Sequence, residues 1–409
     1  MSTQRVVADL LAEVRANGLQ AALDATRRFD GLALDEAALR VPRAAMTGAL
    51  ARMASERPTL VAALEELIGG VRRFARAQRE NLQDLSLPLA QGGRVGERWV
   101  PLRSVGVYVP GGRAFYPSTF AMTVIPAQEA GVGRIVAVTP PRPEGVDPLI
   151  LATAALLGVD ELITLGGAQA IAWLAFGEGV DLIAGPGNRF VAEAKRQLVG
   201  TVGIDSVAGP TELLILADSS ADPAWLAEDL LAQAEHDPEA AAVLVSADAN
   251  LLQAVAFELR TRAEASPRRA ILEQSLSRFG RLLLGDRAQA IAFAQAWAPE
   301  HLQLCVAEPE SWLPELTTAA ALFLGHATAE AFGDYGVGPN HVLPTLRTAR
   351  FSSPLGVATC MKRQSLLCLS PADAAAAAPW VAELAQAEGL HHHGASARLR
   401  AHSPATAGH

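Results

Sequence analysis

The feature that most constrains the fold is a regular alternation of short apolar runs with helical stretches, which starts near residue 105. Strand-like runs such as Val105–Val109 and Arg134–Val138 are each followed by a segment with helical character. The alternation resumes at Leu213–Ala217 and continues to about residue 325. Strands that alternate with helices predict parallel sheets built from βαβ units. We therefore expect an α/β protein with two doubly wound domains.

The same alternation of strand-like and helical segments predicts the domain boundaries. Residues 105–211 form one α/β domain, on the nucleotide side, and residues 212–354 form the other together with the N-terminal helices of residues 1–104. Residues 355–409 are expected to form a helical C-terminal tail. Both domains are expected to be Rossmann-like but without the usual G-x-G-x-x-G turn, because Gly131-Val132-Gly133 precedes a strand instead of following one.

Composition excludes several classes of protein. The chain of 409 residues carries 34 Lys and Arg against 43 Asp and Glu, a net charge of −9, which argues against a nucleic-acid or anionic-membrane partner. Three cysteines without a C-x-x-C pair argue against a disulfide framework and a thiolate zinc site. The most apolar window, Leu162–Phe176, contains Gln169 and is too short to span a membrane. We expect a cytoplasmic protein with no nucleic-acid or membrane partner.

Two glycine-rich turns and one helix end could bind ligands. Gly166-Gly167 and Gly185–Asn188 each follow a strand and open a helix, so they are either phosphate sites or tight turns. Gln233 and His236 are three residues apart at a helix end and share one face. That pair could hold a metal ion, or it could be solvated.

Four further segments carry reactive groups. Glu300-His301 places a carboxyl beside an imidazole, which suits proton transfer but also fits the first turn of a helix. The loop Gly333–His341 carries Asp334 and His341 and is either a site or an ordinary turn. His391–His393 could bind a metal or be solvated, and Cys305 could be a nucleophile or a buried free thiol.

Longer segments, taken in order, resemble the histidinol dehydrogenase family. They are Val105-GVYVPGGRAFYPST, Gly166-GAQAIAWLAFG, Gly185-PGNRFVAEAKRQ, Gly203-IDSVAGPTELLILAD, Asp229-LLAQAEHDP, Ala298-PEHL, and Gly333-DYGVGPNHVLPT followed by Arg350-FSSPL. The resemblance implies a zinc- and NAD-dependent homodimer. Such an enzyme oxidises L-histidinol to L-histidine through histidinal, in two successive hydride transfers that end histidine biosynthesis.

The resemblance also assigns residues. It implies one zinc per subunit, a catalytic pair, contacts to NAD, and contacts to substrate. The implied zinc ligands are Gln233, His236, Asp334 and His393, the last supplied by the partner subunit's C-terminal tail. The implied catalytic pair is Glu300 and His301, and the implied NAD contacts are Tyr108, Gln169 and Asn188. The implied substrate contacts are Thr211, Gln233, His236, His301, Asp334, His341, Glu388 and His393.

In the implied mechanism His301 accepts the alcohol proton, Glu300 activates water, and the metal orients the substrate. The sequence departs from the family pattern at Thr211, where Ser is usual, at Gly18-Leu19, where Gly-Asp is common, in a shorter loop between Gln169 and Asn188, and in a missing N-terminal leader.

One alternative is a related zinc- and NAD-dependent dehydrogenase acting on another alcohol, such as a sulfonated propanediol. A non-catalytic metal-binding homologue is the other, and the acid–imidazole pair argues against it. Glu388 favours a cationic substrate.

Overall fold

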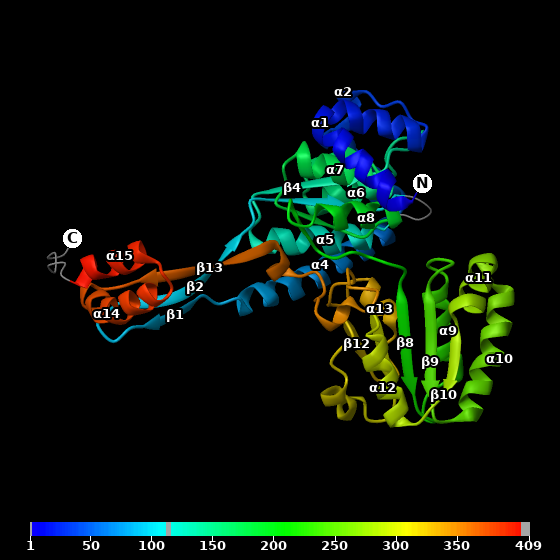
Figure 1. The fold of residues 1–409 in the computed structure, drawn as a ribbon. Helices are drawn as coiled ribbons and strands as arrows, with labels where there is room; N and C mark the ends of the chain where they lie inside the picture. The colour runs from blue at the N-terminus through cyan, green and yellow to red at the C-terminus, as the bar shows by residue number, and fades with distance from the viewer. Residues whose placement is uncertain (1, 112–115, 402–409) are drawn as a thin grey trace. The chain divides into compact units, whose positions relative to one another are not determined.

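The computed structural model describes residues 2–111 and 116–401. These residues divide into two compact units, one made of residues up to 77 together with 102–360, and the other of residues 78–101 together with those from 361 onward. The first unit contains two parallel five-stranded sheets, so the expected α/β class is confirmed (Figure 1). None of the helices in the described part of the chain is long and apolar enough to cross a membrane.

The first sheet has the strand order β5-β4-β3-β6-β7, and all neighbouring strands are parallel. Its first strand in the sequence is therefore central, with the next two strands on one side and the last two on the other. Its strands are β3 (Ser104–Tyr108), β4 (Arg134–Thr139), β5 (Glu161–Thr164), β6 (Leu182–Ala184) and β7 (Gly203–Ile204). Its helices are α5 (Pro117–Ala130), α6 (Pro148–Leu157), α7 (Gly167–Phe176) and α8 (Arg189–Leu198).

The N-terminal helices contribute to the core of the first sheet. Val7, Leu10 and Ala22 of α1 share one buried cluster with Val136 and Ile171. For α1 this differs from the expected packing against residues 212–354, and the physical reason is that the apolar face of α1 covers α7 and α8. Leu67 and Gly70 of α4, by contrast, contact Gly336 of that region. The helices are α1 (Thr3–Asp30), α2 (Glu36–Leu39), α3 (Arg43–Glu56) and α4 (Pro58–Asn81).

The second sheet repeats this strand order as β10-β9-β8-β11-β12, again with parallel neighbours. Its strands are β8 (Glu212–Ala217), β9 (Ala241–Ser246), β10 (Arg281–Leu284), β11 (His301–Cys305) and β12 (Ala321–Leu324). Its helices are α9 (Pro223–Ala234), α10 (Ala249–Ala265), α11 (Arg269–Phe279), α12 (Arg287–Trp297) and α13 (Glu330–Asp334), with short 3₁₀ helices at Pro309–Glu315, Thr348–Arg350 and Val357–Cys360.

The central strand β8 is buried along its whole length, as its continuous apolar run predicts. Leu213 and Ile215 pack with Leu230 of α9, whereas Leu214 and Leu216 pack into the separate cluster on the α12 side. Successive side chains of a strand point to opposite faces, so one six-residue run supplies both cores.

The second unit holds a three-stranded antiparallel sheet with the order β1-β2-β13 and two helices. This corrects the expectation that residues 355–409 are helical throughout, because residues 361–368 pair with β2 as a strand. Asp373 of α14 accepts hydrogen bonds from the backbone N–H groups of Gln91 and Gly93, which joins helix to hairpin. The elements are β1 (Leu85–Pro88), β2 (Arg94–Pro101), β13 (Met361–Cys368), α14 (Pro371–Ala387) and α15 (His391–Ala401).

Candidate active site

The candidate active site lies at the amino ends of β8 and β11, in the first unit. Thr211 directly precedes β8, Glu300 directly precedes β11, and the two strands are neighbours in the sheet. The Thr211 hydroxyl donates to Glu300 Oε2 at 2.6 Å, and the Glu212 N–H donates to the same oxygen at 3.0 Å. These two hydrogen bonds fix the orientation of the buried Glu300 carboxyl group.

His301, the first residue of β11, is 4% exposed and surrounded by oxygen atoms. Its Nδ1 lies 3.1 Å from the Glu212 carbonyl oxygen and 3.6 Å from Glu300 Oε2, and its Nε2 lies 3.7 Å from Glu330 Oε1. Burial by itself lowers the pKa of His301, but the charges of Glu300 and Glu330 raise the pKa above its ordinary value. The ring is therefore suited to accepting a proton.

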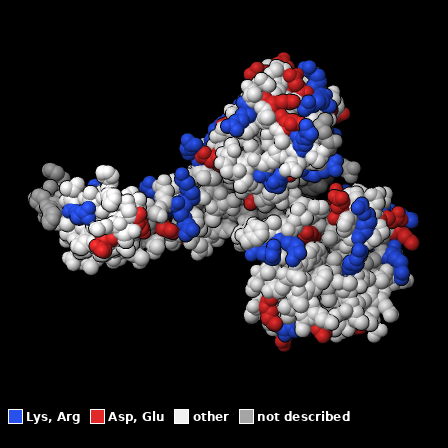
Figure 2. All heavy atoms as spheres, viewed as in Figure 1, with Lys and Arg blue, Asp and Glu red and all other residues white. Residues whose placement is uncertain are grey.

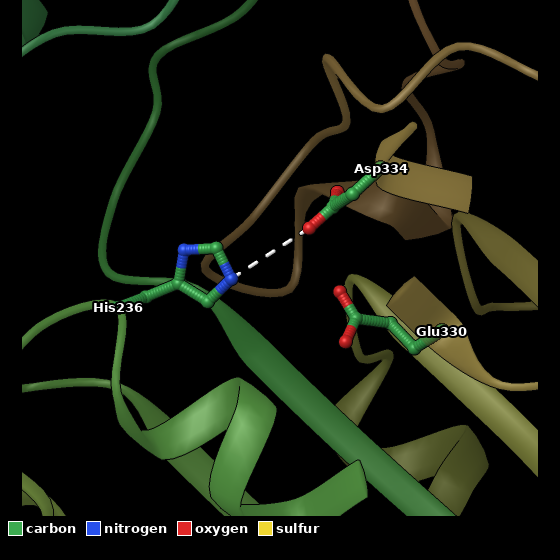
Figure 3. Close-up of side chains that lie close together, drawn as sticks. All are labelled: His236, Glu330 and Asp334. Atoms are coloured by element: carbon green, nitrogen blue, oxygen red, sulfur yellow. Dashed lines mark ion pairs between the residues drawn. The ribbon is translucent and has the colours of Figure 1, made fainter. Parts of the chain in front are cut away.

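A group of metal-type ligands lies beside this pair. His236, which follows α9, has its Nε2 3.6 Å from Asp334 Oδ2, and single ligand atoms of His236, Glu330 and Asp334 all lie within 4.8 Å of one another (Figure 3). Burial alone would raise the pKa of Asp334, but the His341 ring and the other nearby imidazoles lower the pKa below its ordinary value. Asp334 therefore offers an ionised carboxylate that could hold a metal ion.

Gln233, in the last turn of α9, adds an amide oxygen. Its side chain is completely buried, and its Nε2 donates to the Thr211 hydroxyl at 3.1 Å. Its Oε1 is buried and has no hydrogen-bond partner among the described residues. A buried carbonyl oxygen without a partner is costly, so it is a suitable ligand for a cation. Imidazole, carboxylate and amide oxygen together fit a zinc ion.

His341 is fixed at the edge of the same cluster. Its Nδ1 lies 3.1 Å from the Asp334 carbonyl oxygen, and its Nε2 lies 3.1 Å from the Thr119 hydroxyl. The structure therefore brings together seven residues that the sequence singled out as site candidates. They are Thr211, Gln233, His236, Glu300, His301, Asp334 and His341.

Two buried carboxyl groups at this site escaped sequence reasoning. Glu212 is 7% exposed, and burial, together with the nearby Glu300 charge, raises its pKa to about 7. Glu330 is 2% exposed, and burial raises its pKa above its ordinary value. The available signals were the position of Glu212 next to Thr211 and the four-residue spacing of Glu330 and Asp334 on one helix.

Glu388 and His393 are not part of this cluster of the first unit. Glu388 caps the end of α14, His393 lies in the first turn of α15, and both are exposed within the second unit. Their assignment as substrate contact and metal ligand stays a prediction.

The implied NAD contacts lie in a strand of the first sheet and in two of its helices. Tyr108 ends β3 and accepts a hydrogen bond from the Gly167 N–H at 3.1 Å, and Gln169 donates to Asp30 at 2.9 Å. Burial raises the pKa of Tyr108 to about 12, so its hydroxyl stays protonated. Asn188 accepts from the N–H groups of Phe190 and Val191 and so caps α8. These positions remain a prediction for nucleotide binding.

The turn at Gly185 requires glycine. Its φ is +113°, and a Cβ there would collide with the Tyr108 carbonyl oxygen. Two side chains hold the turn by hydrogen bonds to Gly185: Asp205 accepts from its N–H at 2.8 Å, and Lys195 donates to its carbonyl oxygen at 2.9 Å. Lys195 and Asp205 also form an ion pair with each other. Residues 112–115, within the loop after β3, lie outside the described residues.

Cys305 does not have the environment of a nucleophile. It is 2% exposed, and burial raises the pKa of its thiol to about 12. A thiol with that pKa is almost entirely protonated at neutral pH. Figure 2 shows both acidic and basic side chains on the visible side of the molecule.

An α/β fold with a buried acid–imidazole pair beside residues that could hold a metal ion is typical of a proton-transferring enzyme. Comparison with known proteins gives the particular family. The model of the family described as histidinol dehydrogenase matches residues 1–401, and the chain belongs to this family of NAD-dependent oxidoreductases of histidine biosynthesis.

Relatives agree over nearly the whole length. Histidinol dehydrogenase of Pseudomonas aeruginosa is 46% identical over 407 residues, covering 98% of this chain and 91% of its own. That of Ruegeria pomeroyi is 46% identical over 401 residues, covering 97% and 91%. The crystal structure of histidinol dehydrogenase from Elizabethkingia anophelis has a TM-score of 0.91 at 32% identity, covering 98% of this chain and 92% of its own.

Proposed function

We propose that this chain oxidises L-histidinol to L-histidine through histidinal, using two NAD, at the cluster around His301. The observation that carries the proposal is the unpartnered Oε1 of Gln233, whose amide N–H already binds Thr211 beside the acid–imidazole pair. This arrangement joins a cation site to a proton acceptor. The proposed place of action is the cytoplasm, where NAD-dependent biosynthesis draws on a shared nucleotide pool.

The proposed zinc ligands from one chain are Gln233, His236 and Asp334, one ion per subunit. His393 of the partner subunit is the proposed fourth ligand, and its exposure on α15 supports this role. When bound, the metal would supply a positive charge that orients the amino and imidazole nitrogens of histidinol. No cysteine is among the proposed ligands, unlike the closed, cysteine-rich sites of structural zinc.

The proposed proton chemistry uses His301 first. The Glu212 carbonyl can only accept a hydrogen bond, so it fixes the proton of the neutral His301 ring on Nδ1 and leaves Nε2 unprotonated. Nε2 takes the alcohol proton while the hydride passes to NAD, which gives the aldehyde. Glu300 then takes a proton from water while the hydroxide adds to the aldehyde carbon, and the carbonyl oxygen takes the proton held on His301, which gives the hydrate. The hydrate passes a second hydride to the second NAD and a proton to His301, and becomes the carboxylic acid.

The proposed nucleotide contacts are Tyr108, Gln169 and Asn188. Tyr108 lies at the carboxyl end of β3, whose neighbour β6 continues into the Gly185 turn. In open parallel sheets the ligand crevice lies at such a switch in strand order. Asn188 is exposed at the start of α8, which supports a contact with a phosphate-bearing cofactor.

The proposed substrate contacts combine two copies of the chain. One copy would supply Thr211, Gln233, His236, His301, Asp334 and His341, and a second copy in a homodimer would supply Glu388 and His393 by exchange of the C-terminal tail. An exposed carboxylate such as Glu388 suits a cationic imidazole or amine. The substrate is the small molecule L-histidinol.

The test is the amount of NADH formed per L-histidinol consumed by purified protein with zinc. We expect about two NADH per histidinol, one for each two-electron oxidation. Chelation should abolish the activity, and added zinc should restore it. No NADH from histidinol, together with oxidation of a sulfonated propanediol, would refute the proposed substrate.

A further inference from the structure

Glu330 is a buried carboxyl group that the proposed mechanism does not use. It is the first residue of α13 and is 2% exposed. Among residues 2–111 and 116–401 its one ion-pair partner is His301, with Oε1 3.7 Å from Nε2. Burying a carboxyl group is unfavourable unless a nearby group compensates it. The position of Glu330 therefore points to a function that involves the His301 ring.

The two nitrogens of His301 have different neighbours. Nδ1 lies 3.1 Å from the Glu212 carbonyl oxygen, so the ring proton resides there in the neutral form. Nε2 is the nitrogen that gains a proton, and Glu330 is the carboxyl group beside it. Glu300 lies on the other side, 3.6 Å from Nδ1, and its Oε2 is already engaged by Thr211 and Glu212.

We propose that Glu330 is a positioning residue for His301: it holds the ring with Nε2 toward the substrate and balances the positive charge that appears when Nε2 takes the alcohol proton. The inference rests on the proposed function and adds a residue to it. The negative groups that face the ring are Glu300 on the β11 side and Glu330 and Asp334 on α13. Of these, Glu330 alone forms an ion pair with Nε2 in the described part of the chain.

A role as an additional zinc ligand is the competing explanation. Glu330 and Asp334 lie one turn apart on α13, and both carboxyl groups lie near His236 (Figure 3). The two explanations predict different results when the charge of Glu330 is removed. If Glu330 is a zinc ligand, the variant loses zinc; if Glu330 positions His301, the variant keeps zinc and has a lower kcat.

The experiment compares Glu330→Gln, Glu330→Asp and Asp334→Asn with the unaltered full-length protein, all loaded with zinc. For Glu330→Gln we expect kcat to fall about 10- to 100-fold, less than the roughly 100- to 10,000-fold that the general base itself contributes, because His301 remains in place. KM for histidinol should change less than about threefold, and zinc content should stay unchanged. Glu330→Asp keeps the negative charge but at a greater distance from His301, so its kcat should lie between those of the unaltered protein and Glu330→Gln. Asp334→Asn should lose zinc and serves as the contrast on the same helix.

Each outcome decides the matter. Zinc loss in Glu330→Gln as large as in Asp334→Asn would overturn the proposal in favour of a ligand. An unchanged kcat in Glu330→Gln would also overturn the proposal. The same holds if the kcat of Glu330→Asp is no higher than that of Glu330→Gln, because an effect of charge requires that the shorter acid restores part of the rate. If Glu330→Gln does not fold, Glu330→Asp still tests the split between kcat and KM. An unaltered protein that makes no NADH from histidinol would refute the proposed function, which is a separate result.

Discussion

At the scale of single residues, the Thr211 hydroxyl links the metal ligands to the proton-transfer groups. It donates to Glu300 and accepts from the amide of Gln233, so one oxygen orients two side chains. Threonine has the same hydroxyl group as the serine that the family resemblance predicts at this position. The threonine therefore preserves the hydrogen bonds to Glu300 and Gln233.

This linkage predicts a difference between two conservative variants. Thr211→Ser should keep near-normal kcat/KM, because the hydroxyl remains. Thr211→Val, which is close to threonine in shape, leaves Glu300 and Gln233 each short of one hydrogen bond, at about 1–3 kcal/mol, or roughly 5- to 150-fold in kcat/KM. Steady-state rates with histidinol and NAD check this, and equal rates for both variants would show that the hydroxyl does not matter.

At the scale of elements, the site depends on where strands and helices end. Glu300 and Thr211 meet because β11 and β8 are neighbours, and Gln233 and His236 reach them because α9 runs back toward the amino ends of the strands. In the first sheet the proposed nucleotide site lies at the carboxyl ends of the strands, where Gly185, held by Asp205 and Lys195, forms the turn after β6.

The buried pair under that turn gives a second prediction. Lys195 and Asp205 are 1% and 2% exposed, and Lys195→Met would leave Asp205 buried without its charge partner. Removal of one member of a buried pair costs about 3–5 kcal/mol. We expect a lower melting temperature and a raised KM for NAD, measured by thermal unfolding and by initial rates.

The double variant Lys195→Met with Asp205→Asn is the control. It removes both charges, so it should recover part of the stability lost in the single variant. A single variant as stable as the unaltered protein would contradict the assigned role of the pair.

At the scale of the whole molecule, the chain consists of two units, and the predicted ligand set is divided between them. Gln233, His236 and Asp334 belong to the first unit, and Glu388 and His393 belong to the second. The proposed homodimer joins the two sets by exchange of the tail between copies.

Mixing two inactive variants tests this exchange. In a heterodimer of His236→Asn and His393→Asn chains, exchange gives one site with both histidines intact and one site with neither. Random assembly from equal amounts then restores about a quarter of the sites. The readout is NADH formation with zinc after joint refolding or co-expression. If each tail serves its own chain, every site lacks one histidine and the mixture stays as inactive as its components.

Sequence patterns predicted the α/β class because periodicity reports local burial. The continuous apolar run Leu213–Ala217 predicted a buried strand, and β8 is one. The three-residue spacing of Gln233 and His236 predicted one shared helix face, although His236 follows the last residue of α9, Ala234. The family motifs then added roles to residues that local spacing left open. Residues 361–368 were not recognised as a strand because the partner β2 lies more than 250 residues earlier, at Arg94–Pro101.

What the sequence determined by itself was the set of local elements and the residues able to act chemically. Only the tertiary structure decided which of them meet, because strand order and helix direction bring together groups that are distant in the chain. It placed α1 on the first sheet, aligned Glu300 with Thr211 at the amino ends of two neighbouring strands, and set Glu330 against Nε2 of His301. Burial of that carboxyl group, which gives it its proposed role, is a property of packing and is not encoded in any local pattern.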